Sequence, residues 1–175
     1  MSFLDQNPST MSLLKANICK QIVEGRPVNF KKELSEIADV INRQSPNTIA
    51  DLEKLATPKL LGDIYLAALD EAIQEIQTQI SVAIRAGRPL ERERESVLRK
   101  NQEAARKRLR NVTDMLSDGG QFRFGGAATP FFLIYREETV QGQMAYSITD
   151  FETGDLTLLR TPTNILGTER GYLDR

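Results

Sequence analysis

Any chemistry on this 175-residue chain has to be built without histidine, because the sequence contains none. The Ser-His-Asp and Cys-His arrangements of nucleophilic enzymes are therefore excluded. Histidine-ligated zinc, iron and haem sites are excluded as well, and a lone cysteine, Cys19, gives neither an internal disulfide nor a four-cysteine metal site. Carboxylates, Lys, Arg, Tyr and backbone groups are left for catalysis. We expect a protein that is not an enzyme and binds no cofactor.

The carboxylates and glycines match no known ligand-binding motif. Asp63, Asp70 and Glu71 fall in one helical segment, but di-metal helical bundles combine such carboxylates with histidines. The glycine pairs at 119–120 and 125–126 suggest a phosphate cradle. Such cradles need a helix directly after the glycines, and the sequence that follows, "ATPFFLIY", predicts a strand. We expect a hinge or loop there.

A basic stretch is the first candidate for binding. Residues 85–110 contain ten Lys or Arg and four Glu, a surplus of +6, as in helices that contact phosphates. However, Glu95 with Arg99 and Glu103 with Lys107 have the spacing of pairs within one helix, and the stretch has no aromatic residue to stack on a base. A solvated face is favoured over an acidic partner protein or nucleic acid. The candidate contacts for an anionic partner are Arg99, Arg106, Lys107, Arg108 and Arg110.

Apolar residues recur every three or four positions in five segments. This periodicity predicts helices over 10–24, 30–43, 48–56, 58–86 and 89–117. The second and third have the cadence of a helix-turn-helix. The third carries a net negative charge that would repel DNA, so plain helical packing is predicted.

The last two helices are long and closely connected, which predicts an antiparallel helical hairpin. A turn at residue 88 would place Asp70 and Glu71 opposite Ala105 and Arg106, so that acidic and basic helices meet. The tripeptide Gly-Arg-Pro occurs at this turn and again at 25–27. In both places we predict a helix boundary, because Gly adopts the left-handed end of a helix and Pro suits the start of the next.

The sequence changes character after residue 118. Residues 119–129 are rich in glycine and predict a hinge. Strand-like runs follow at 130–137, 143–149 and 156–160, separated by turn residues, and they predict a small antiparallel meander over 130–160. Residues 161–175 read as a polar tail.

The first of these strands is apolar on both faces, and such strands are normally covered on both sides. A three-stranded meander has little with which to cover itself. We predict that one face packs on the helices, and that a neighbouring chain or the tail covers the other. The predicted partner-binding residues are Phe131, Phe132, Leu133, Ile134, Tyr135, Ile165, Leu166, Tyr172 and Leu173.

Together these patterns predict an α+β protein. It would have a short-helix region over 1–57, a hairpin over 58–118, and then the hinge, meander and tail. We expect a structural or adaptor subunit of an oligomeric protein assembly, by analogy with phage or secretion-type assemblies. The alternative is a replication or transcription accessory factor that binds nucleic acid through the basic helix. With a net charge of −1, no signal peptide and no membrane span, a cytoplasmic or virion setting is expected.

Overall fold

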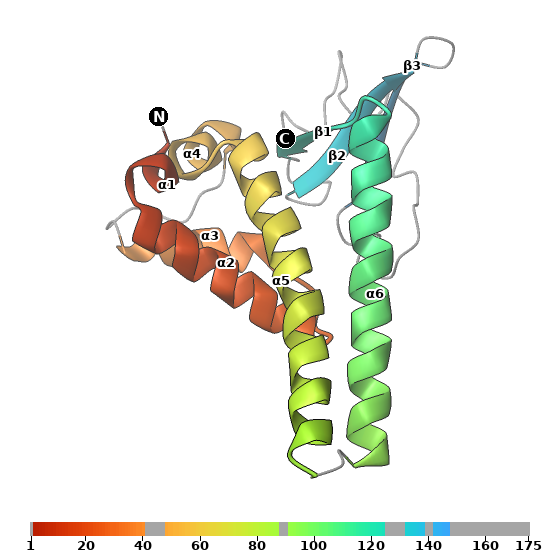
Figure 1. Cartoon of the computed structure of the whole chain (residues 1–175). Helices are drawn as coiled ribbons and strands as arrows, with labels where there is room; N and C mark the ends of the chain where they lie inside the picture. Colours follow the sequence, from red (N-terminus) through yellow and green to blue (C-terminus); the bar gives the residue numbers. More distant parts are fainter. Residues whose placement is uncertain (1, 41–47, 88–90, 125–131, 139–141, 148–175) are drawn as a thin grey trace.

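The computed structural model describes residues 2–40, 48–87, 91–124, 132–138 and 142–147. These residues form six helices and three strands (Figure 1). The helices are α1 (Phe3–Gln6), α2 (Pro8–Val23), α3 (Phe30–Val40), α4 (Ile49–Leu55), α5 (Pro58–Arg85) and α6 (Arg92–Ser117). The strands are β1 (Gln121–Phe124), β2 (Phe132–Glu138) and β3 (Gly142–Ser147). The coarse prediction of a helical region followed by a small antiparallel sheet is confirmed.

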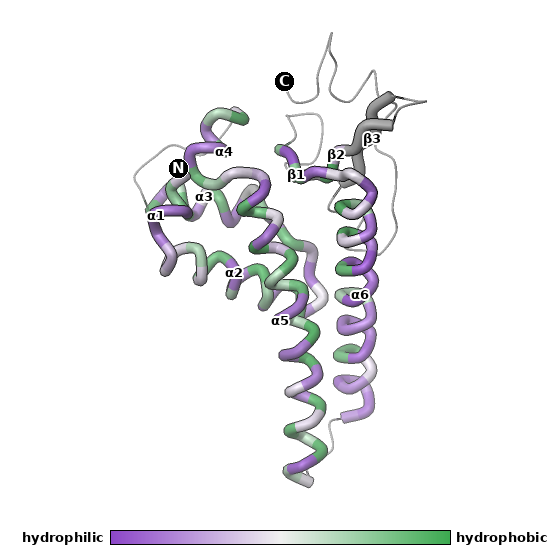
Figure 2. The backbone as a smooth tube through the Cα atoms, turned by 45° about the horizontal axis from the view of Figure 1, so that its top comes forward, coloured by the Kyte–Doolittle hydropathy of each residue, from purple (hydrophilic) through white to green (hydrophobic). Residues whose placement is uncertain are grey.

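Helices α5 and α6 lie side by side and run in opposite directions (Figure 1). The side-chain amide of Gln102 on α6 is buried between them and donates to the backbone oxygen of Ile73 and to Oε1 of Gln77, both at 3.2 Å. This is the register that a turn at residue 88 produces. The hydrophobic residues of α6 face α5, and its outer side is hydrophilic (Figure 2). The apolar seam read from the sequence therefore positions the two helices.

Helix α2 crosses α5 and joins it to the short helices (Figure 1). Its buried residues, Leu14, Ile18 and Ile22, have the predicted spacing of four. Phe30 of α3 packs edge-on against Tyr65 of α5, with ring centroids 5.3 Å apart. One hydrophobic core thus connects α2, α3 and α5.

Side-chain caps fix several helix starts. The hydroxyl of Thr57 accepts from the backbone N–H of Leu60, Thr48 caps α4 in the same way, and Oδ1 of Asn29 accepts from the N–H of Lys32. The helices predicted from residues 30, 48 and 58 start within one residue of these positions. Helix α2, however, begins at Pro8 and follows α1, which has a Ser2–Asp5 capping box. The hydrogen bonds from Ser2 lower the pKa of Asp5.

The antiparallel sheet has the strand order β1-β2-β3. Strand β1 lies inside the predicted hinge 119–129, so the hinge prediction was wrong for residues 121–124. The hinge was predicted from the glycine content, but two phenylalanines of this segment face inward. Phe122 lies against α5 at Gly62, and Phe124 is buried. Strands β2 and β3 overlap the first two predicted strands. The predicted strand 156–160 and the tail 161–175 lie outside the described residues.

Within the described ranges, none of the helices is both long enough and apolar enough to cross a membrane.

Candidate functional site

The structure places the predicted partner-binding strand in the core of its own chain. Phe132, Ile134 and Tyr135, which were predicted to bind a partner, are all buried. Phe132 stacks on Phe122 of β1, with ring centroids 5.2 Å apart, and the Arg123 guanidinium lies 4.4 Å from the ring centroid of Tyr135. Strand β1 therefore supplies part of the cover of this strand, of which one face was predicted to pack on the helices and the other to be covered by a neighbouring chain or the tail.

The remaining predicted partner residues are not tested. The side chain of Leu133 and the residues Phe131, Ile165, Leu166, Tyr172 and Leu173 lie outside the described part of the structure.

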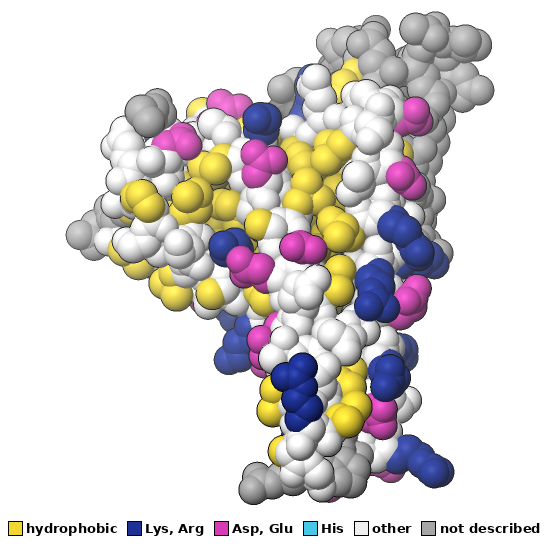
Figure 3. Space-filling model, in the orientation of Figure 1, with side chains coloured by type: hydrophobic (Ala, Val, Ile, Leu, Met, Phe, Trp, Pro, Cys, Tyr) yellow, Lys and Arg dark blue, Asp and Glu magenta, His cyan; other side chains and the backbone are white. Residues whose placement is uncertain are grey.

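The basic residues of α6 divide into two kinds. Arg108 is 5% exposed and faces the interior, so it does not contribute to an outer basic face as predicted. Arg99, Arg106, Lys107 and Arg110 are exposed, and Lys and Arg side chains line the outer side of α6 (Figure 3). Nη2 of Arg99 lies 2.8 Å from Oε1 of Glu95, which confirms that predicted pair. Nη2 of Arg110 lies 3.7 Å from Oε1 of Glu103.

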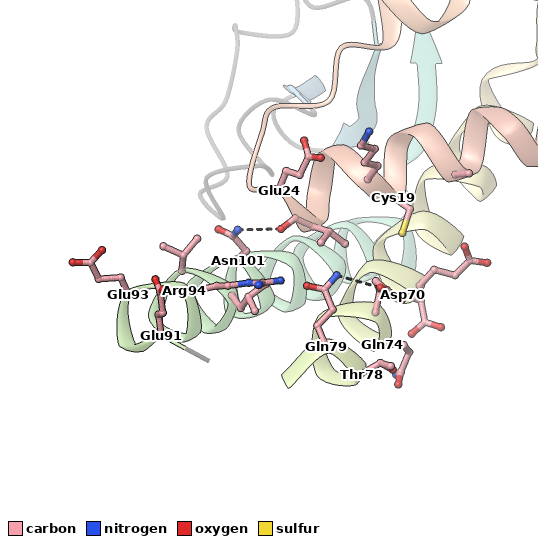
Figure 4. A pocket seen from close by; sticks show the side chains of 17 residues that line it. Cys19, Glu24, Asp70, Gln74, Thr78, Gln79, Glu91, Glu93, Arg94 and Asn101 are labelled. Carbon is pink, nitrogen blue, oxygen red and sulfur yellow. Dashed lines mark hydrogen bonds between the residues drawn. The ribbon is translucent and has the colours of Figure 1, made fainter. Parts of the chain in front are cut away.

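A groove of about 1080 Å³ lies where the second half of α2, the middle of α5 and the first half of α6 meet (Figure 4). Each helix contributes residues three or four positions apart, which is one face of a helix. The α2 side consists of Ala16, Cys19, Lys20, Val23 and Glu24. The α5 side consists of Asp70, Glu71, Gln74, Glu75, Thr78 and Gln79. The α6 side consists of Glu91, Glu93, Arg94, Val97, Leu98 and Asn101.

Part of the groove surface is apolar. Val23 and Leu98 pack in a small cluster with Ile76 and Ile80, which holds α5 and α6 together below the end of α2. Val97 lies one residue from Leu98 but is 53% exposed. The groove therefore offers water-exposed apolar surface next to a packed interior.

The charged residues around this surface are mostly acidic. Six carboxylates and two cations, Lys20 and Arg94, line the groove, which gives a net charge of −4. Two carboxylates have cationic partners outside it: Glu71 lies 2.9 Å from Nζ of Lys15, and Glu24 pairs with Arg26. Counting those two cations as well leaves −2. The whole 175-residue chain carries −1, so negative charge is concentrated here.

Asn101, which lines the groove, connects α6 to the end of α2 (Figure 4). The side-chain amide of Asn101 donates to the backbone oxygen of Val23 at 3.1 Å. The next turn contains Gly25, at φ 72°, and a Cβ there would lie 2.6 Å from Oδ1 of Asn101. The geometry of the groove thus depends on the first Gly-Arg-Pro turn.

Cys19 lines the groove, and its pKa responds to the acidic residues around it. Burial raises the pKa of the Cys19 thiol, and the negative charges of Glu71 and Glu75 raise it further, against an opposing effect of Lys15. The thiol is therefore held in its neutral form, unlike a reactive cysteine in an electropositive site. Among the residues that the structure describes, no three Cys, Asp or Glu side chains are grouped so as to hold a metal ion.

The groove could not be identified from the sequence. The helices that contain its α2 and α5 sides were predicted, but their convergence depends on how α2 crosses α5, which helical periodicity does not determine. Neither known protein families, curated proteins nor solved structures gave a match when compared with this chain.

Proposed function

We propose that this protein is a non-enzymatic structural or adaptor subunit of a larger protein assembly. The proposed architecture is the α5–α6 hairpin joined to a meander that continues into residues 156–160. The observation that carries the proposal is exposed apolar surface on the end of the long helix pair. Val82, Ile84 and Val97 are 55%, 66% and 53% exposed. Val82 and Ile84 lie in the last turn of α5, and Val97 lies in the second turn of α6.

Two of these residues lie on the groove side. Val82 follows the groove residues Glu75 and Thr78 by seven and four positions, so it continues their face of α5. Val97 is in the groove itself. Exposed apolar surface of this kind, bordered by charged residues, is typical of protein–protein contact sites.

Purification of the tagged full-length chain from its native cells, followed by cross-linking and light scattering, tests this function. We expect a stoichiometric partner protein in the cross-linked complex. Val82→Ser with Val97→Ser should lose that partner while keeping the helical circular dichroism. The matched control is Leu13→Ser with Val40→Ser, which changes two exposed apolar residues elsewhere. A monomer at every concentration, with no cross-linked partner, would contradict the proposal.

A nucleic-acid accessory function is the second candidate, because Arg99, Arg106, Lys107 and Arg110 are exposed on α6. It is the weaker one, since Arg99 and Arg110 lie within 4 Å of glutamates of the same helix. A gel shift at low salt that disappears in Arg106→Glu with Arg110→Glu would support it. No shift at low salt would remove it.

A further inference from the structure

We propose that the groove between α2, α5 and α6 binds a basic amphipathic helix, about three turns long, of a partner protein. This inference rests on the proposed adaptor function and assigns to it a surface and a class of partner. Its physical basis is a groove that combines a partly apolar lining, a limited length and an excess of carboxylates.

The shape of the groove favours a helix. Its α6 side runs from Glu91 to Asn101, which is about 15 Å at 1.5 Å per residue, or about three helical turns. The apolar residues of its lining include Val23, Val97 and Leu98, of which Val97 is 53% exposed and Leu98 packs between the long helices. An amphipathic helix would place apolar residues at positions i, i+3, i+4 and i+7 against this part of the groove and leave its other side in water.

The charge of the groove selects a basic helix. Asp70 and Glu75 border it on α5, and Glu91 and Glu93 border it at the start of α6. Lys or Arg residues flanking the apolar stripe of a bound helix would reach both edges. Complementary charges of this kind raise the association rate and disfavour acidic partners.

Two other occupants fit less well. Residues 148–175 of this chain contain five Asp or Glu and three Arg, a net charge of −2, and an acidic groove repels an acidic segment. A second copy would have to present its basic helix, α6. Among the described residues of α6, Val97 alone is large, hydrophobic and exposed. The outer face of α6 therefore has no apolar stripe to place in the groove.

Three synthetic peptides of about 12 residues, the length of three turns, test the inference. The first has leucines at helical spacing between flanking Lys residues. The second has the same composition in scrambled order, and the third has Glu in place of Lys. We expect the full-length protein to bind the first peptide at least about tenfold more tightly than either other peptide, measured by fluorescence anisotropy. The affinity should fall as the ionic strength is raised.

Two matched pairs of charge reversals locate the binding. Asp70→Lys with Glu93→Lys changes one groove residue on each long helix. Asp63→Lys with Asp114→Lys changes one exposed carboxylate on each helix outside the groove, so the net charge changes equally. We expect the groove variant to bind the first peptide about tenfold or more weakly than the wild type does, and the control variant to bind it less than about threefold more weakly. Circular dichroism confirms that both variants are folded.

Equal binding of the ordered and scrambled peptides, or equal weakening by the two variants, would overturn the inference. A dimer in light scattering that only the groove variant dissociates would also overturn it, in favour of a second copy. The proposed adaptor function has a separate test: it is contradicted if no partner protein is cross-linked to the full-length chain. A partner that binds the groove variant as tightly as the wild type would leave that function standing and exclude the groove.

Discussion

The turn at Gly25 and the side chain of Asn101 are in direct contact, although 76 positions separate them in the sequence. Asn101 donates to the last turn of α2, and its side chain occupies the space that a Cβ at position 25 would need. Gly87, in the second Gly-Arg-Pro copy, has a similar φ of 64°, but apart from its chain neighbours none of the described residues has an atom within 4 Å of a Cβ placed there. Identical tripeptides therefore have unequal roles: the first joins α2 to α6, and the second ends α5.

A double-mutant cycle measures this inequality. Gly87→Ala should lower the free energy of unfolding by about 1 kcal/mol, the cost of a left-handed non-glycine residue. Gly25→Ala should cost about 1 kcal/mol more, because it also displaces the Asn101 hydrogen bond. In an Asn101→Ala background the two glycine substitutions should cost the same. Urea unfolding provides the values, and equal costs in the wild-type background would show that the contact contributes nothing.

A second close approach joins α5 to the sheet. A Cβ at Gly62 would lie 2.1 Å from Cδ2 of Phe122, which is closer than any side-chain contact allows. Gly62→Ala should therefore lower the free energy of unfolding by about 1–3 kcal/mol through overpacking. In a Phe122→Ala background the same change should be stabilising, by up to about 1 kcal/mol, because Ala is the better helix former. A substitution with the same sign in both backgrounds would contradict the proposed packing.

Five of the six described helices, all except α1, could be predicted because their signals are local. Thr57 and Pro58 fix the start of α5, and the buried residues from Leu69 to Ile80 carry its periodicity. The burial of Arg108 and the short strand β1 could not be predicted in this way. Both depend on which residues of distant elements cover them, and neither glycine content nor charge contains that information.

The same distinction explains the candidate site. The surplus of charge on α6 was visible in the sequence, but the acidic groove needs α2 to bring Glu24 beside the glutamates of α5 and α6. Glu71 was expected opposite the basic helix, whereas it pairs with Lys15 of α2. A third helix thus redistributes the charges that a two-helix hairpin would have matched.

A buried carboxylate links α2 to α3. Glu33 is 6% exposed and accepts from the side-chain amides of Gln21 at 2.7 Å and Asn17 at 3.4 Å. Glu33→Ala leaves both donors without this acceptor and should cost about 1–3 kcal/mol of unfolding free energy. Glu33→Gln keeps one acceptor oxygen and should cost less.

Glu36 lies on the same helix, is exposed, and is the matched control for Glu33. Its Ala and Gln variants should stay within about 0.5 kcal/mol of the wild type in thermal and urea unfolding. If Glu33→Ala is as mild as Glu36→Ala, the carboxylate does not connect the two helices.

The reactivity of Cys19 reports the charge of the groove. Burial and the carboxylates of Glu71 and Glu75 raise its pKa, so at a given pH less thiolate is present than for an exposed cysteine. Alkylation by iodoacetamide should therefore require higher pH. Glu75→Gln removes a negative charge, which favours the thiolate, so the pKa falls and alkylation at fixed pH becomes faster. Lys15→Gln acts in the opposite sense, because the nearby cation lowers the pKa.

Alkylation rates at a series of pH values, followed by intact mass spectrometry, measure these shifts. Asp63→Asn is the control, because it removes the same charge near the start of α5, outside the groove. The difference between Glu75→Gln and this control should shrink as salt is added, since screening weakens charge–charge effects at exposed sites. If the difference between the two alkylation profiles does not change with salt, Glu75→Gln altered the burial of Cys19 and not the electrostatic potential at its thiol. Identical profiles for the two variants would show that the carboxylates do not act on the groove as a group, and the electrostatic argument for a basic partner would lose its support.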